Sequence, residues 1–205
     1  GNRRGESSSL MNLGLIANNR GEYDEAERLH NESLDIDRER GDRRGEATSL
    51  NNLGLIANNR GDYEEAERLY NESLAIKREI GDRRGESHSL NNLGLIAINR
   101  GEDDEAERLH NESLAIKREI GDREGESGSL DNLGVTAYNR GDLDEAERLY
   151  NESLAIRRDI GNRRGESSSL MNLGLIANNR GEYDEAERLS RESVRIQNEI
   201  GIPLD

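Results

Sequence analysis

The side chains best suited to acid–base or nucleophilic chemistry are few and scattered in this sequence. Its histidines are His30, His88 and His110. His30 and His110 fall at a packing position of a predicted helix, and His88 stands alone on another. The serine runs at 7–9 and 167–169 have no base within sequence reach. No phosphate loop or dinucleotide fingerprint is present, so we predict no catalytic residue and no enzyme.

Metal and modification sites are equally weak. The acidic stretch 101–105 lacks the ligand spacing of a calcium-binding EF-hand loop and is better explained as carboxylates at a helix start. The chain has no cysteine, which excludes disulfides and thiolate ligands. Four sequons place their serines on a predicted buried stripe, so glycosylation is not expected; they begin at Asn31, Asn71, Asn111 and Asn151. We predict no metal and no cofactor.

The composition limits the partners. The net charge is −15, which argues against nucleic-acid binding, because phosphate contacts need Lys and Arg in excess. Lys77 and Lys117 are the only lysines among 29 basic residues. This bias is typical either of halophilic, acidic proteins or of a GC-rich genome. No apolar run is long enough for a membrane span or a signal peptide, so we expect a cytoplasmic protein that does not bind membranes.

A strict internal repeat organises the chain. Gly-Asp-Arg-Arg-Gly-Glu at 41–46 recurs at 81–86, and variants begin at residues 1, 121 and 161. Residues 1–29 are identical to residues 161–189. Only 31% of the residues are hydrophobic, which is thin for one globule but sufficient for stacked units that each bury one face. We predict a single array over 1–205, with repeats 1–40, 41–80, 81–120, 121–160 and 161–200 and a short tail at 201–205.

Each repeat holds two amphipathic helical patterns. In the second repeat these predict helices at about 43–59 and 62–79, with apolar or small residues recurring every three or four positions. Gly61 breaks the chain between them, and Asp62 and Glu65 have the spacing of a capping box. Asp24 and Arg28 exemplify acid–arginine pairs four residues apart that we expect on the exposed face of each second helix.

The run 50–54, followed by 61–66 and then Tyr70, resembles the tetratricopeptide repeat (TPR) pattern. Leu50 stands where that family often has Trp, Arg78 stands where it often has Pro, and the unit is six residues longer than usual. The longer form is similar to the repeats of kinesin light chain and of the Pins family. The resemblance implies an all-α fold, an α-α solenoid (superhelix) of five 40-residue helix-turn-helix repeats, and a non-enzymatic protein-binding scaffold.

In that family the first helices line a concave groove. The corresponding positions here are almost free of charge, and amides beside apolar side chains suit an extended peptide. The series at 12, 52, 92, 132 and 172 also resembles the asparagine ladder of the kinesin light chain type. Alternatively, these asparagines cap neighbouring carbonyls or reflect recent duplication. The predicted peptide-binding groove comprises Asn12, Asn52, Asn92, Asn132, Asn172, Asn51, Asn91, Leu15, Leu55, Leu95, Val135, Leu175, Asn58, Ile98 and Tyr138.

Paired arginines precede four of the five predicted groove segments, and Arg123-Glu124 stands before the fourth. One arginine of such a pair is expected at the groove edge: Arg44, Arg84 and Arg164. Salt bridges to nearby carboxylates are their alternative role. The expected partner is a protein or peptide. Two alternatives remain: the chain is the sensor array of a larger signalling protein, or it self-assembles. The last repeat carries polar changes typical of a cap, whereas the first keeps the internal apolar pattern. The first repeat is therefore expected either to be cut from a longer chain or to pair with another copy, and self-assembly into a homo-oligomer would use this N-terminal repeat.

Overall fold

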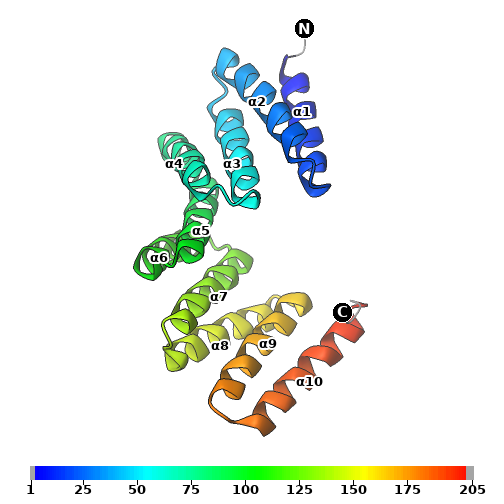
Figure 1. Cartoon of the computed structure of the whole chain (residues 1–205), viewed down its shortest axis with the longest axis vertical. Coiled ribbons are helices and arrows are strands. Elements are labelled where there is room, and N and C mark those ends of the chain that lie inside the picture. The colour runs from blue at the N-terminus through cyan, green and yellow to red at the C-terminus, as the bar shows by residue number, and fades with distance from the viewer. Residues whose placement is uncertain (1–2, 202–205) are drawn as a thin grey trace. The chain divides into compact units, whose positions relative to one another are not determined.

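The computed structural model describes residues 3–201, and over these residues the chain forms ten α-helices and no strand (Figure 1). The predicted all-helical repeat fold is confirmed, and the predicted helices of the second repeat agree with the observed ones to within one residue. The helices are α1 (Arg3–Asn19), α2 (Tyr23–Arg40), α3 (Arg43–Asn59), α4 (Tyr63–Glu79), α5 (Arg83–Arg100), α6 (Asp103–Glu119), α7 (Arg123–Asn139), α8 (Leu143–Asp159), α9 (Arg163–Asn179) and α10 (Tyr183–Glu199).

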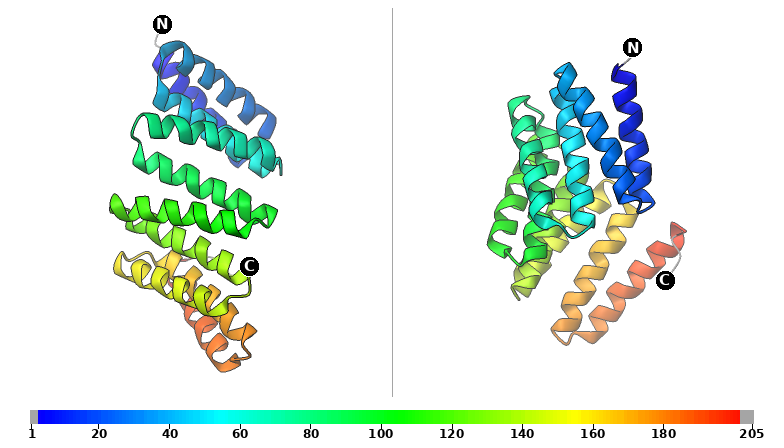
Figure 2. Two further views of the ribbon diagram at one scale, coloured as in Figure 1. Left: turned by 90° about the vertical axis from the view of Figure 1, so that its left-hand side faces the viewer. Right: turned by 45° about the horizontal axis from the view of Figure 1, so that its top comes forward.

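The chain divides into two compact units, Gly1–Arg100 and Gly101–Asp205. In the described part of unit 1, each of the helices α1 to α4 packs against the helix that follows it, and in the described part of unit 2 each of the helices α6 to α9 does the same. Figure 2 shows these neighbours lying side by side in each unit. Because every helix mainly contacts its chain neighbours, a modest apolar stripe on each suffices for the core. The single array over 1–205 stays a prediction.

Glycine and aspartate shape the turns between helices. Gly61 has a φ of 80°, in the left-handed region that glycine enters without steric cost. The side chain of Asp62 then caps α4 by accepting a hydrogen bond from the Glu65 amide at 3.2 Å. Only this half of the expected capping box forms, because the Glu65 carboxylate pairs with Arg68 instead.

Inside a repeat, the two helices meet around a large ring placed on a glycine. A Cβ at Gly54 would lie 2.8 Å from the ring of Tyr70, which is 2% exposed. The absence of a side chain at Gly54 therefore makes room for this ring. Ser73 is fully buried on the same helix as Tyr70 and donates to the Ala47 carbonyl at 2.7 Å, which agrees with the predicted burial of the sequon serines.

His30 and His110 occupy the Tyr70 position in two other repeats, as predicted, and both are fully buried. A Cβ at Gly14 would lie 2.6 Å from His30 Nε2. Neither ring nitrogen of either histidine has a hydrogen-bond partner among the described residues. Burial lowers the pKa of both imidazoles to about 4, because a charged ring would lose its hydration without gaining a counter-ion.

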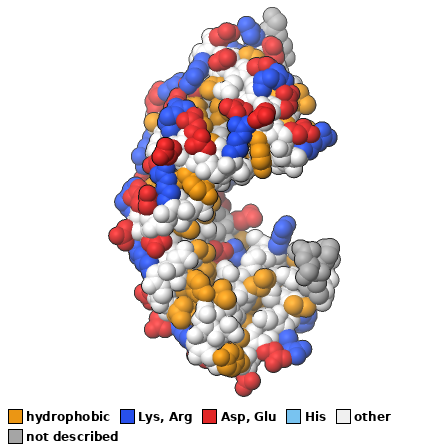
Figure 3. Space-filling view, in the orientation of Figure 1, with side chains coloured by type: hydrophobic (Ala, Val, Ile, Leu, Met, Phe, Trp, Pro, Cys, Tyr) orange, Lys and Arg blue, Asp and Glu red, His pale blue; other side chains and the backbone are white. Residues whose placement is uncertain are grey.

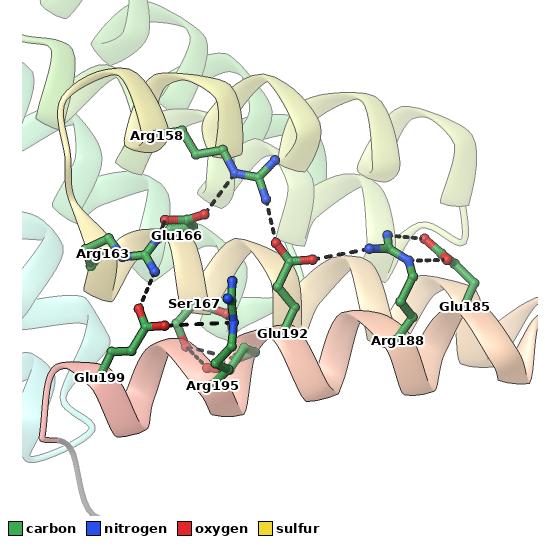
Figure 4. Close-up of polar contacts among 10 residues, drawn as sticks. Arg158, Arg163, Glu166, Ser167, Glu185, Arg188, Glu192, Arg195 and Glu199 are labelled. Carbon is green, nitrogen blue, oxygen red and sulfur yellow. Dashed lines mark hydrogen bonds and ion pairs between the residues drawn. The ribbon is translucent and has the colours of Figure 1, made fainter.

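Ion pairs join successive repeats. Glu46 is 7% exposed and lies between Arg38 of the preceding second helix, at 3.0 Å, and Arg43 of its own helix, at 2.6 Å. Figure 4 shows the same arrangement at the last junction, where Arg158 of α8 binds both Glu166 of α9 and Glu192 of α10. Each of these junctions therefore encloses a carboxylate that arginines from two repeats neutralise.

The expected pair of Asp24 with Arg28 does not form. Arg28 binds Glu25 at 2.6 Å and Glu32 at 2.5 Å along its own helix, while Asp24 pairs with Arg60 of the next repeat. The prediction was wrong because it considered an isolated helix, whereas Arg60 approaches Asp24 from the end of α3. On the face shown in Figure 3, acidic and basic side chains are accordingly interspersed rather than separated into fields of one sign.

We predict opposite effects for one substitution at two equivalent glycines. Gly54→Ala should lower the melting temperature, because its methyl group would overlap the Tyr70 ring and overpacking costs about 1–3 kcal/mol. At Gly174 an added Cβ would lie 3.4 Å from its nearest neighbour, Ser190 Oγ, so Gly174→Ala should raise the melting temperature through the better helix propensity of alanine. Circular dichroism melts of both variants test this; equal shifts would contradict it.

A second prediction concerns acid stability. The unfolded chain binds protons at His30 and His110 below pH about 6.5, whereas the folded chain does so only near pH 4. The free energy of unfolding should therefore fall as the pH falls through that window, by about 2 kcal/mol per histidine at pH 5.

The control for this prediction replaces both histidines with tyrosine, the residue that other repeats carry at this position. His30→Tyr/His110→Tyr should lose less stability than the wild type between pH 7 and pH 5 in denaturant titrations. Parallel pH profiles for the two proteins would rule out the histidine contribution.

Candidate functional site

The predicted groove residues all lie on the first helices of the repeats, and none is buried. Leu15, Leu95 and Leu175 are the most exposed of the apolar ones, at 40%, 38% and 48%. Asn12 is exposed, whereas the asparagines at 52, 92, 132 and 172 are half-buried. The remaining members are also half-buried: Asn51, Asn91, Leu55, Val135, Asn58, Ile98 and Tyr138. We call these fifteen residues the groove set.

Hydrogen bonds link the groove set between successive first helices within each unit. Asn92 Nδ2 donates to Asn51 Oδ1 at 3.4 Å. Asn59, just outside the set, donates to Asn18 at 3.2 Å in the same unit. In unit 2, Asn179 donates to the Tyr138 hydroxyl at 2.5 Å. Part of the amide capacity on this surface is therefore used inside the protein, and neighbouring first helices are held in register by it.

Two lysines of the second helices contact first-helix side chains from the protein interior, a role that the sequence did not predict. Lys77 of α4 is 6% exposed, and its Nζ donates to Ser89 Oγ at 2.8 Å and to Asn51 Oδ1 at 3.3 Å. Lys117 of α6 donates likewise to Ser129 at 2.8 Å. Burial lowers the pKa of Lys77 to about 8 and lowers that of Lys117 in the same direction. The only two lysines of the sequence thus lie against or near the groove set.

In the fourth repeat the same position carries an ion pair. Arg157 binds Asp131, which takes the place of Asn51 and Asn91 in the fourth repeat, and also donates to Ser169 Oγ at 2.9 Å. The two side chains are only 11% and 16% exposed. Burial raises the pKa of Asp131, and the charge of Arg157 opposes that rise. The charge of Asp131 is therefore compensated inside the protein.

The Lys77–Asn51 and Arg157–Asp131 contacts each join residues 26 positions apart, and the residue types at these two positions change together along the repeated sequence. Where the first helix carries asparagine or aspartate, the second helix carries lysine or arginine. Where the first helix carries methionine, the second helix has no cation at this position. Aligning the repeats would have revealed this signal. In sequence, the residues at these two positions are Met11 and Asp37, Asn51 and Lys77, Asn91 and Lys117, Asp131 and Arg157, and Met171 and Gln197.

The Lys77 contact determines the orientation of two side-chain amides, those of Asn51 and Asn92. An ammonium group only donates hydrogen bonds, so the Asn51 atom 3.3 Å from Lys77 must be the oxygen. Since Asn92 donates to the same oxygen, Asn51 keeps its NH₂ group, and Asn92 keeps its oxygen, for other contacts. Neighbouring repeats thus offer a donor and an acceptor, which is the complement of a peptide group.

The arginine pairs divide between the two roles considered for them. The first arginine of the pair at 43–44 forms salt bridges with Glu46 and Glu79, at 2.6 and 2.5 Å, and Arg163 binds Glu199 at 2.6 Å. The second members, Arg44, Arg84 and Arg164, are exposed. In these pairs one arginine thus stabilises the fold, and the other remains at the surface of the first helix.

Other chemistry finds little support in the described residues. Between the second helices lie cavities of about 260 Å³, such as the one lined by Arg38, Arg60 and Glu72, whose charges form the junction ion pairs. Over residues 3–201, no three His, Asp or Glu side chains are grouped so that they could hold a metal ion. In the same range, no helix has the length and apolar character needed to cross a membrane.

A family model described as tetratricopeptide repeat matches the sequence in four overlapping windows, 6–79, 45–119, 85–159 and 126–199. No curated protein matches the sequence.

Solved structures share the fold at low sequence identity. BtubC (BKLC) from P. vanneervenii has a TM-score of 0.84 and 22% identity over 97% of this chain and 82% of its own. A putative kinesin light chain from Podosopora anserina, with nearly identical TPR-like repeats, has a TM-score of 0.77 and 20% identity over 96% of both chains. A Rap protein complexed with competence and sporulation factor has a TM-score of 0.81 and 15% identity over 95% of this chain and 54% of its own.

We predict that the fourth-repeat ion pair tolerates joint replacement better than single replacement. Arg157→Gln should cost about 3 kcal/mol, because it leaves the Asp131 carboxylate buried without its cation. Asp131→Met/Arg157→Gln introduces the pair found in the last repeat and should recover at least half of that loss. Denaturation of the single and double variants measures both effects; a double variant less stable than Arg157→Gln would contradict the pairing.

Proposed function

Because the chain belongs to the tetratricopeptide repeat family, whose members are generally non-catalytic protein-interaction scaffolds, we propose that it binds an extended peptide segment of a protein partner along the groove set. The resemblance to kinesin light chain repeats extends to the solved structure from Podosopora anserina. The Rap protein, of which this chain matches 54%, is complexed with competence and sporulation factor.

The observation that carries the proposal is the fixed orientation of the amides. Asn51 has its oxygen engaged by Lys77 and offers N–H groups, while Asn92 in the next repeat has its NH₂ group engaged and offers an oxygen. A peptide backbone alternates between C=O acceptors and N–H donors, so it matches this pattern whatever its side chains are. Because the buried lysine sets the pattern, no amide reorientation is needed on binding.

The charges and apolar side chains of the surface support the same ligand. The carboxylate of Asp131, which takes the place of Asn51 in the fourth repeat, is compensated by Arg157, so an uncharged backbone would meet no unpaired charge there. Leu15 and Leu95 are exposed on the same helices as the amides and can receive side chains of the segment. Arg84 at the edge would contact an acidic side chain if the partner carries one.

The test uses peptides selected from a random phage-displayed library against the whole chain, with affinities measured by fluorescence anisotropy. Asn52→Ala/Asn92→Ala/Asn132→Ala should weaken binding about a hundredfold, since each lost amide contact contributes roughly 1 kcal/mol. The melting temperature should fall only slightly, because the loss of the Asn92 bond to Asn51 is offset by the better helix propensity of alanine.

The matched control removes one asparagine from the second helix of each of the same three repeats. Asn71→Ala/Asn111→Ala/Asn151→Ala should keep the wild-type affinity. Equal losses in both triple variants, or a drop in stability that accounts for the whole loss in the first, would exclude the groove set as the binding surface. Failure to select any peptide would also count against the proposal.

A further inference from the structure

One interior position of the second helices differs in charge between the first repeat and the next three. Lys77, Lys117 and Arg157 hold this position in the second, third and fourth repeats. Each of them donates a hydrogen bond, at 2.8 to 2.9 Å, to a buried serine of the following first helix. The equivalent residue of the first repeat is Asp37. A positive charge at three junctions is therefore exchanged for a negative charge at the first.

The carboxylate of Asp37 is buried, and only one of its oxygens has partners. Asp37 is 1% exposed on α2, the helix that packs against both α1 and α3 (Figure 1). Its Oδ1 accepts a hydrogen bond from Ser7 at 2.8 Å. Its Oδ2 faces Gly45, where an added Cβ would overlap it, and forms no hydrogen bond within residues 3–201. A charged oxygen in such a place is strongly destabilising unless a cation or a proton joins it.

The neighbouring charges do not balance this carboxylate. The guanidinium group of Arg40 lies 3.5 Å from Asp37 Oδ1 and 3.8 Å from Asp42 Oδ2, so two acids share one cation at long distances. Burial raises the pKa of Asp37, and the acids Asp42 and Glu46 add to this rise. The interior of the first junction is therefore rich in acid, whereas the later junctions carry a lysine or an arginine there.

Hydroxyl groups supply further oxygen atoms next to Asp37. Ser7, Ser33 and Ser49 come from α1, α2 and α3, and each is at most 1% exposed. Ser49 donates to Ser33 Oγ at 3.3 Å, and Ser33 donates to the Ser7 carbonyl at 3.3 Å. Since a hydroxyl group has one hydrogen and two lone pairs, each of these oxygens keeps at least one lone pair. Oxygen atoms of this kind are the ligands that hard cations prefer.

We propose that the first junction binds a monovalent cation, sodium or potassium, through Asp37 Oδ2 and the neighbouring oxygen atoms. The ion takes the role that a lysine ammonium or an arginine guanidinium group has at the next three junctions. One carboxylate balances a single charge. A divalent ion such as Mg²⁺ needs more acid, and it retains water molecules for which a solvent-excluded carboxylate leaves little space. The site shares no residue with the groove set.

A proton on Asp37 is the competing explanation, because it would also remove the buried charge. The O–H group of a carboxylic acid needs an acceptor in its turn, and no described residue forms a hydrogen bond with Oδ2. The two explanations differ in their response to salt, since a neutral acid gains nothing from one particular cation.

The test follows amide hydrogen exchange of the full chain by mass spectrometry at neutral pH. Sodium, potassium and choline chloride are compared at about 0.3 M, so that charge screening is the same in all three. Exchange in segment 32–49 should be at least about threefold slower in an alkali salt than in choline chloride, because an ion that binds only the packed junction stabilises it. The alkali salt with the larger effect identifies the preferred ion.

The later junctions are controls within the same molecule. Segments 72–89, 112–129 and 152–169 contain the lysine or arginine of their own junction, so their exchange should be the same in the three salts.

Variants then assign the effect to the carboxylate. Asp37→Asn, an isosteric change that removes the charge, should abolish the difference between salts. Asp37→Lys/Arg40→Ile introduces the residues of the second repeat, and its tethered ammonium group should likewise make exchange independent of the salt. Asp35→Asn removes an exposed carboxylate of the same helix and should respond as the wild type does. Circular dichroism confirms that each variant is folded.

Equal exchange of segment 32–49 in the three salts would overturn the proposal, since Asp37 would then be protonated or satisfied by Arg40. So would an effect that the control segments share, or one that persists in Asp37→Asn. Slower exchange in magnesium chloride but in neither alkali salt would refute the assignment of a monovalent ion. The peptide affinities described above are independent of these outcomes.

Discussion

The repeat junction depends on a buried carboxylate held by two arginines. Glu46 alone in this position would lose several kcal/mol of hydration free energy. Arg38 of the preceding repeat and Arg43 of its own helix both bind the Glu46 carboxylate, so its charge is fully neutralised only when the two repeats stack in one geometry. Such a pair adds little net stability compared with apolar packing, but removal of one partner is costly. The ion pairs therefore fix the arrangement of helices whose apolar stripes are narrow.

The interior of each repeat follows a different rule, in which one ring and one glycine fit together. Tyr70 covers Gly54, and His30 covers Gly14. Where Ser190 replaces the ring, a Cβ at Gly174 would make only an ordinary van der Waals contact, at 3.4 Å from Ser190 Oγ. The groove set lies on the surface of the first helix of each pair. Lys77, which is buried on the second helix, donates a hydrogen bond to Asn51 of this set. The surface is thus preorganised by a residue that lies almost wholly beneath it.

Periodicity was enough to predict the fold, because local signals repeat at each step. Glycine turns, aspartate caps and apolar stripes located the helices nearly to the residue, and the burial of His30 and Ser73 followed from the stripe. The sequence could not show that Asp24 binds Arg60, since that contact depends on how far α3 lies from α2. The sequence also placed the groove set on first-helix positions that are at least partly accessible. The role of Lys77 was not predicted, because a lysine in a highly charged helix gives no sign that it is buried.

Identical sequence does not mean identical environment in this molecule. Residues 1–29 and 161–189 are the same, yet Leu13 is exposed and Leu173 is buried. The junction contacts, by contrast, recur with the same residue types each time, as Arg38 with Glu46 and Arg158 with Glu166 show. A recombination event that inserts or deletes one 40-residue segment therefore joins surfaces that are already compatible. The copy number of the repeat can drift between generations without any compensating mutation, and the length of the surface that the groove set forms would change with it.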